Sequence, residues 1–191
     1  MDIVERAVAV LQRDGIIVYP TETVYGLGAD AFSEDAVHRV YEVKRRPLGK
    51  PMSVAVSDED MLWAIAMVDD AAEAFIRRFL PGPVTVVLPA TSCIPAVLTG
   101  GTGRIGIRMP DCEIAIAIIA ELDAPITATS ATIAGKREPV RPDEVTVVYD
   151  LLVDGGTLPG TPSTVVDLVD RTILRPGAEA DAVARYIASM D

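Results

Sequence analysis

Histidine and cysteine are scarce in this sequence, which has one histidine, His38, and two cysteines, Cys93 and Cys112. A Ser-His-Asp or Cys-His site needs a histidine as its base. We interpret His38 as an ordinary helix residue, because it lies inside a predicted helix. The cysteines form no CxxC pair and are expected to be reduced thiols. Together with His38 they are too few ligands for a structural zinc site.

Long apolar runs and phosphate-loop motifs are absent as well. No apolar stretch approaches the roughly 20 residues that a membrane helix needs. The first residues show no basic segment followed by an apolar core, so we expect no signal peptide and a cytoplasmic location. Neither a GxxxxGK(S/T) motif nor a GxGxxG motif after a strand occurs. A nucleotide site in this chain must therefore be built from other residues.

Positive charge is also in short supply, with 17 Lys and Arg against 28 Asp and Glu and a net charge of −11. An acidic chain is a poor general binder of nucleic acids, because affinity for the backbone comes mainly from Lys and Arg. Ten of the 17 basic residues nevertheless fall in four short stretches: 44–50, 104–108, 136–141 and position 175. Such clustering indicates a local anion site, although solvated loop charges would give the same pattern.

Apolar spacing alternates between a helical and a strand pattern, which is typical of an α/β domain. The length of 191 residues suits a single domain over residues 1–191. Helices are predicted over residues 3–13, 34–43, 58–67, 69–80, 111–121 and 179–190. Strands are predicted over residues 16–19, 52–56, 84–88, 104–108, 126–129, 164–168 and 172–174. Ser33 is expected to cap the second helix, and Gly15 is expected to end the first in a left-handed conformation.

The segment 20–28 reads PTETVYGLG and directly follows a predicted strand. A plain turn needs no Thr-Glu-Thr, and two glycines so close together indicate an unusual backbone path. Farther along, Lys44 and Arg46 would lie on one side of an extended chain, with Lys50 as a third cation. Arginine binds phosphate as a bidentate fork and lysine as a point charge, so this loop suits a polyphosphate.

Hydroxyl and basic side chains also follow later strands. Ser130 lies in TATSAT (127–132), whose hydroxyls suit phosphate or ribose, although threonine is also ordinary in strands. Ser163 and Arg175 lie in PSTVVD and LRPG, each of which alone would pass as an ordinary strand end.

Taken together, these segments resemble the YrdC family, and the resemblance covers essentially the whole chain. The matching segments are PTETVYGLG at 20–28, K-x-R at 44–46 followed by Lys50, GRIGIR at 103–108, TSAT at 129–132, PSTVVD at 162–167 and LRPG at 174–177. The resemblance implies a twisted, mostly mixed β-sheet flanked by helices, with a concave, positively charged cleft that carries the site.

The resemblance also implies an ATP-dependent nucleotidyltransferase, an L-threonylcarbamoyladenylate synthase. Such enzymes condense L-threonine, bicarbonate or CO2, and ATP, and another complex transfers the threonylcarbamoyl group to adenosine 37 of tRNA. The residues implied to bind ATP are Lys44, Arg46, Lys50, Arg104, Ser130 and Arg175, with Lys44 and Arg46 also catalytic and Mg2+ on the phosphates. The residues implied to bind threonine are Thr23, Arg108 and Ser163.

The chemistry agrees with this residue set, because adenylate formation needs positioning and charge stabilisation rather than a side-chain nucleophile. The sequence departs from the family pattern in TSAT, in residues 52–56, at Arg104 and after Lys136. Two alternatives stay open. One is a paralogue that makes another carbamoyl- or acyl-adenylate, and the other is a non-catalytic protein that binds double-stranded RNA or tRNA.

Overall fold

The computed structural model describes residues 1–190. Its helices are α1 (Ile3–Leu11), α2 (Glu34–Lys44), α3 (Glu59–Ile65), α4 (Asp70–Phe79), α5 (Ala96–Thr99), α6 (Glu113–Leu122) and α7 (Ala180–Ala188), with a 3-10 turn at Pro142–Glu144. Its strands are β1 (Ile17–Tyr19), β2 (Gly26–Gly28), β3 (Val54–Ala55), β4 (Val84–Pro89), β5 (Arg104–Arg108), β6 (Ile126–Thr127), β7 (Thr129–Ser130), β8 (Leu151–Leu152), β9 (Thr164–Asp167) and β10 (Thr172–Arg175). Helices and strands alternate, which confirms the predicted α/β class.

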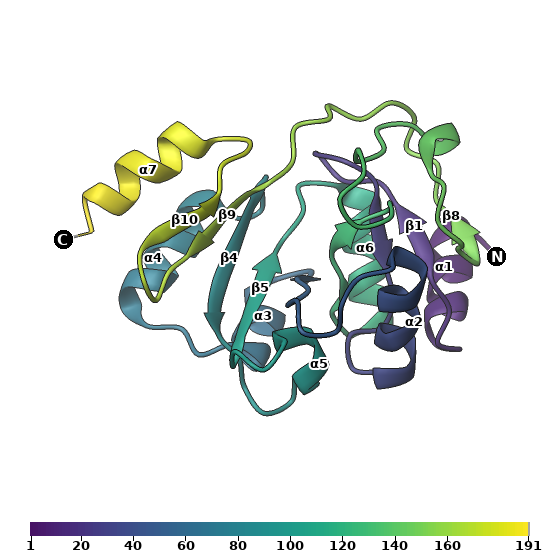
Figure 1. Ribbon diagram of the computed structural model, residues 1–191, viewed down its shortest axis with the longest axis horizontal. Coiled ribbons are helices and arrows are strands. Elements are labelled where there is room, and N and C mark those ends of the chain that lie inside the picture. The colour runs from purple at the N-terminus through teal and green to yellow at the C-terminus, as the bar shows by residue number, and fades with distance from the viewer. Residues whose placement is uncertain (191) are drawn as a thin grey trace.

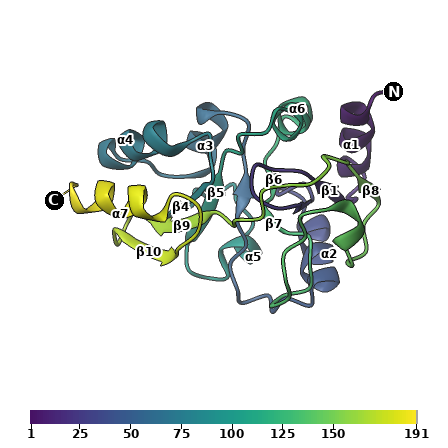
Figure 2. The same ribbon diagram turned by 90° about the horizontal axis from the view of Figure 1, so that it is seen from above.

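The strands form two mixed sheets with the orders β7-β2-β1-β8 and β10-β9-β4-β5-β3-β6. Strand β1 pairs antiparallel with β2 and parallel with β8, while β4 pairs antiparallel with β5 and parallel with β9. Helices α1, α3, α4 and α6 lie along one side of the sheets, and α2 and α5 lie on the other (Figure 2). The first and last helices are at opposite ends of the molecule (Figure 1).

The predicted strand over residues 126–129 is two strands that belong to different sheets. Strand β6 pairs with β3, whereas β7 pairs with β2. Ala128 lies between them and donates its N–H to the carbonyl of Ser53 over 2.7 Å. The chain therefore passes from the six-stranded to the four-stranded sheet within one residue, which brings the two sheets together at this point.

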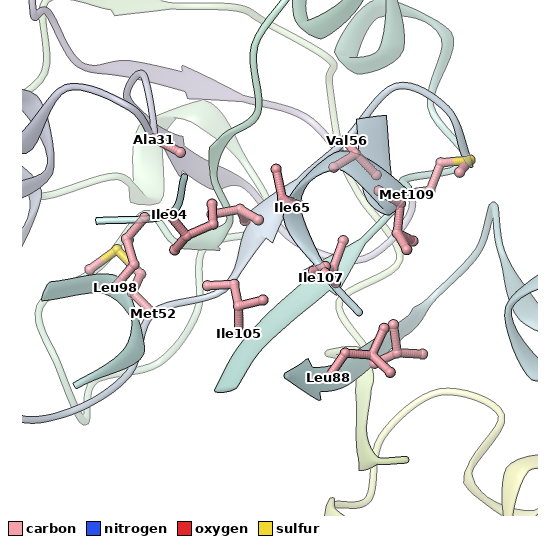
Figure 3. Packing of buried hydrophobic residues seen from close by; sticks show 14 of the residues in the cluster. Ala31, Met52, Val56, Ile65, Leu88, Ile94, Leu98, Ile105, Ile107 and Met109 are labelled. Atoms are coloured by element: carbon pink, nitrogen blue, oxygen red, sulfur yellow. The ribbon is translucent and has the colours of Figure 1, made fainter. Parts of the chain in front are cut away.

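The main core lies beneath β5. Ile105 and Ile107 are fully buried and pack near Ile65, Leu88 and Leu98 (Figure 3). Because side chains alternate along a strand, the intervening residues of β5 face the opposite side. The core thus fixes which side chains of β5 are available to a site.

Two local predictions about α1 and α2 have different outcomes. Ser33 caps α2 as predicted, with its hydroxyl accepting the N–H of Ala36 over 3.2 Å. The left-handed residue after α1 is Asp14, with φ 57°, and not Gly15. A Cβ at Gly15 would lie 2.4 Å from Cγ1 of Val10, so this glycine is needed for close packing rather than for its φ angle.

The glycines of the PTETVYGLG segment also serve close packing. Gly26 and Gly28 lie in the regular strand β2, so the predicted unusual backbone path is wrong. A Cβ at Gly26 would lie 2.7 Å from Cζ of Tyr19, and one at Gly28 would lie 2.9 Å from Cε1 of the same ring. The ring of Tyr19 therefore crosses β2 at a place where only glycine fits.

We expect Gly26→Ala to lower the free energy of unfolding by about 1–3 kcal/mol, because the added methyl group collides with the buried Tyr19 ring. Gly49→Ala is the control, since nothing lies within 4 Å of its Cβ position. Urea unfolding of both variants measures the difference. Equal stability of the two variants would contradict this account of β2.

Candidate functional site

A cleft of about 1120 Å³ lies where the two sheets meet. Its lining comes from β1 and β2, from β4, β5 and β9, and from the segments after α2 and β7. Eight of the nine predicted site residues line it: Thr23, Lys44, Arg46, Arg104, Arg108, Ser130, Ser163 and Arg175. The ninth, Lys50, has an exposed side chain outside this lining, and its carbonyl accepts the hydroxyl of Tyr41 over 2.8 Å.

The cleft is richer in positive charge than the chain as a whole. Seven Lys or Arg residues line it against three Asp or Glu residues, although the net charge of the chain is −11. Acidic residues are thus concentrated elsewhere, and the cleft is suited to an anionic ligand.

The floor of the cleft is formed by neighbouring strands of the six-stranded sheet. Val87 on β4 lies opposite Gly106 on β5 and Asp167 on β9. A Cβ at Gly106 would lie 2.3 Å from Oγ of Ser53, so this glycine leaves room for the side chain of Ser53 beside the floor. Arg104 and Arg108 are four residues apart on β5, or about 13 Å, and place one arginine at each end of this strand.

Arg108 is held in a buried polar network at one end of the floor. Its Nη1 donates to Oγ1 of Thr23 over 3.1 Å, and its Nη2 pairs with Oε1 of Glu22 at 2.6 Å. Oγ1 of Thr21 donates to the carbonyl of Val24 over 2.7 Å, so Thr23 donates its own hydroxyl to Thr21 over 2.8 Å. Each residue of the Thr-Glu-Thr segment thus helps to fix Arg108 or its neighbours.

Lys44 is almost fully buried and contacts main-chain carbonyls. Its ammonium donates to the carbonyls of Ser130 and Thr132, the latter over 2.7 Å. The carbonyl of Lys44 in turn accepts the N–H of Ala134 over 2.9 Å. An ammonium has three N–H groups, so one remains for a ligand in the cleft.

The predicted extended conformation of K-x-R is wrong. Lys44 is the last residue of α2, and Arg45 has the left-handed angles φ 51° and ψ 42°. This turn, rather than the period of an extended chain, brings both Lys44 and Arg46 to the cleft. Arg46 donates from Nη2 to the carbonyl of Pro51 over 2.6 Å, while its Nε is buried without a partner.

Burial lowers the pKa of Lys44 from its ordinary value of 10.5 to about 8. The nearby charge of Arg46 lowers the pKa further, and Glu138 opposes the change. Since the folded protein loses this proton at a lower pH than the unfolded chain, the unfolded chain binds more protons between about pH 8 and pH 10.5. The contribution of Lys44 to stability therefore rises with pH across that window.

We expect the free energy of unfolding to rise more with pH in the wild-type protein than in Lys44→Met. Between about pH 7 and pH 11 the two rises should differ by on the order of 2–3 kcal/mol. All other titrating groups are common to the two proteins and cancel in the difference. Urea unfolding at several pH values measures it. Parallel pH curves for the two proteins would contradict a depressed pKa of Lys44.

Arg104 lies at the other end of the floor and forms ion pairs with two aspartates. Its Nη1 lies 2.6 Å from a carboxylate oxygen of Asp167 and 2.6 Å from one of Asp170, and these ion pairs raise the pKa of Arg104. Arg104 is therefore less available to phosphate than the sequence indicated. Neither aspartate was predicted as a site residue, because Asp167 looks like an ordinary end of a strand and Asp170 like an ordinary turn residue.

Ser163 and Arg175 both line the cleft and contact each other. Nη2 of Arg175 donates to the carbonyl of Ser163 over 2.9 Å and to its hydroxyl over 3.2 Å. The hydroxyl of Ser163 also lies 2.9 Å from that of Thr85. Arg175 is 3.9 Å from Glu138, which the sequence did not single out. The arginine thus keeps donors for a ligand, because its ion pair with Glu138 is long.

Within residues 1–190, no group of three or more His, Cys, Asp or Glu side chains is arranged to hold a metal ion. None of the helices in that range is both long and apolar enough to cross a membrane.

Comparison with known proteins finds relatives of this chain. A family model named Sua5/YciO/YrdC, with the description telomere recombination, matches residues 9–177. The threonylcarbamoyl-AMP synthase of Pyrococcus abyssi (strain GE5 / Orsay) is 41% identical over 174 residues, which are 86% of this chain and 51% of that protein. The chain spans about half the length of the curated relatives that it matches first.

Two solved structures are also similar. The crystal structure of P. abyssi Sua5 complexed with L-threonine matches with a TM-score of 0.89 and 37% identity, covering 94% of this chain and 56% of that one. E. coli YciO matches with a TM-score of 0.83 and 28% identity, covering 92% of this chain and 89% of that one.

Proposed function

This chain belongs to the Sua5/YciO/YrdC family, and from that membership we propose that it is an L-threonylcarbamoyladenylate synthase. In this proposal the cleft condenses L-threonine, bicarbonate or CO2, and ATP, and releases pyrophosphate. The product would serve the threonylcarbamoyl modification of adenosine 37 in tRNA, completed by a separate transferase complex in the cytoplasm. The protein would then be an ATP-dependent nucleotidyltransferase.

One observation carries the proposal: two arginines with unused donors face one cleft. Arg46 and Arg108 both line the cleft, and the hydrogen bonds within residues 1–190 use one N–H group of Arg46 and two of Arg108. A guanidinium has five N–H groups, and donors left without partners are costly, so the remaining ones indicate ligand groups that complete them. Two separate anion sites suit one substrate with phosphates and another with a carboxylate.

We assign the ATP phosphates to the end of the cleft that holds Arg46 and the remaining N–H of Lys44. Ser130 and Arg175 also line the cleft and would contact the nucleotide. Lys50 and Arg104 are left out of this contact set, because Lys50 is exposed and Arg104 is paired with two aspartates. Magnesium would enter bound to the phosphates of ATP, because the described residues offer it no preformed set of ligands.

We assign threonine to the end of the cleft that holds Arg108. The guanidinium would take the carboxylate, while Thr23 and Ser163 are buried hydroxyls in reach of the rest of the molecule. The P. abyssi relative whose structure contains L-threonine supports threonine as the amino acid in this proposal.

The reaction follows from these positions. The deprotonated amine of threonine attacks the carbon of CO2, and a proton leaves the nitrogen for solvent as the carbamate forms. A carbamate oxygen then attacks the α-phosphorus of ATP as the bond to pyrophosphate breaks. The negative charge on the leaving pyrophosphate is stabilised by Arg46 and Lys44, and no side chain forms a covalent bond.

A second candidate is a paralogue that makes another carbamoyl- or acyl-adenylate. The observation in its favour is that Arg104, a position at which the sequence departs from the family pattern, lines the cleft and is paired with Asp167 and Asp170.

Incubation of the purified protein with ATP, Mg2+, bicarbonate and one amino acid at a time distinguishes these candidates. Pyrophosphate release that needs threonine is the expected result, and release with a different amino acid would favour the paralogue. No turnover with any amino acid, together with salt-sensitive binding of tRNA, would favour an RNA-binding protein.

A further inference from the structure

Glu22 is the central residue of the Thr-Glu-Thr segment, and the proposed chemistry gives it no contact with a substrate. Its side chain is only 16% exposed and pairs with Arg108. The lining of the cleft includes its neighbours Thr21 and Thr23 but not Glu22 itself. Glu22 thus contacts Arg108 from behind the cleft wall. A buried carboxylate in this place needs an explanation, because burying a charge is costly unless pairing and hydrogen bonds offset the loss of hydration.

The hydrogen bonds of Arg108 show how the carboxylate of Glu22 affects the arginine. A guanidinium has five N–H groups: one on Nε and two on each terminal nitrogen. One N–H of Nη1 donates to Thr23, one N–H of Nη2 donates to Glu22, and Nε is buried. Two N–H groups remain, one on each terminal nitrogen, which is the number that an end-on fork toward a carboxylate requires.

The unpaired atoms of the pair agree with this arrangement. Oε2 of Glu22 and Nε of Arg108 are both buried without a partner. They are the two atoms that would form the second bond of a side-on bidentate pair with Glu22. The side-on edge of the guanidinium is therefore directed toward the protein, and the end-on edge is left for the cleft.

We propose that Glu22 is a positioning residue that orients Arg108 so that its end-on fork faces the cleft and binds the carboxylate of the amino-acid substrate. The inference rests on the proposed function for the identity of that substrate. Glu22 touches no reacting atom and acts only through Arg108.

The test is the Glu22→Gln variant, which keeps the size of the side chain and removes its charge. We expect the KM for threonine to rise about 10-fold, because the fork is no longer held. The KM for ATP and the kcat at saturating threonine should stay within about threefold, since a positioning role leaves the phosphate site and the chemistry intact. An unchanged KM for threonine would overturn the inference.

The matched control is Glu73→Gln, which removes an ion pair to Arg77 on α4, where the two side chains are 2.7 Å apart and partly exposed. This variant should leave all three kinetic constants unchanged. If Glu22→Gln does not fold, Glu22→Asp keeps the charge beside Arg108 but shortens its reach. The same rise in the KM for threonine is expected of it, and an unchanged value would again overturn the inference.

A double-mutant cycle separates action through Arg108 from a direct role of Glu22. Arg108→Gln and the double variant Glu22→Gln/Arg108→Gln should have the same affinity for threonine, measured by calorimetry. Additive losses would show that Glu22 contacts the substrate itself and would overturn the inference.

The same calorimetry keeps this inference apart from the proposed function. If the wild-type protein binds a different amino acid and not threonine, the proposed function fails, and that amino acid becomes the probe for the cycle. If it binds no amino acid, the fork accepts no carboxylate and the inference itself is overturned.

Discussion

Arg46→Ala should lower kcat/KM for ATP by about 10²–10³-fold, the loss that follows removal of one preorganised donor to developing charge. Arg46 lines the cleft, its Nη2 is fixed by the carbonyl of Pro51, and its Nε has no partner among residues 1–190. Its remaining N–H groups are therefore held in place for a ligand and are not needed for hydrogen bonds that stabilise the fold. Steady-state release of pyrophosphate, measured with varied ATP, gives this number.

Arg45→Ala is the matched control, because it removes the same charge one residue away. Arg45 is exposed and does not line the cleft. Its substitution should change kcat/KM by no more than about threefold, since exposed charges interact weakly with a site. Equal losses in the two variants would mean that Arg46 acts only through the general charge of the loop, and the assigned phosphate site would be wrong.

Arg108→Lys should raise the KM for threonine by about 10²-fold while leaving the KM for ATP within about threefold. Lysine keeps the positive charge beside Glu22 but lacks the planar fork. One ammonium cannot donate to Thr23, to Glu22 and twice to a substrate carboxylate. Titration of threonine at saturating ATP measures the effect.

The control for this variant is Arg78→Lys on α4, which is exposed and away from the cleft lining. It should leave both constants unchanged. If Arg108→Lys instead weakened ATP and left threonine unaffected, the two ends of the cleft would have to be exchanged.

The sequence predicted the helices and longer strands well, because their apolar spacing is set by burial on one side. It could not predict that residues 126–129 divide between two sheets, since both halves have the same β-branched pattern and only their partners differ. The short strands β2 and β8 were also not predicted. Strand β2 consists of two glycines around Leu27, and its regular structure depends on the ring of Tyr19.

The candidate site was predicted better by residue type than by geometry. Lys44 and Arg46 reach one cleft, but through a left-handed Arg45 that ordinary propensities disfavour. The pairing of Arg104 with Asp167 and Asp170 spans more than sixty residues of sequence and left no local pattern. The role of Glu22 was visible only as an unexplained acid between two threonines, because its partner Arg108 lies 86 residues away in sequence.

The central claim is that the cleft joins threonine to AMP through a carbon atom from bicarbonate. Mass spectrometry of the product formed from ATP, L-threonine and carbon-13 bicarbonate tests it most directly. The account predicts an adenylate that appears only when all three substrates are present and that carries the carbon-13 label. A threonyl-adenylate without the label, or release of pyrophosphate that does not depend on threonine, would contradict it.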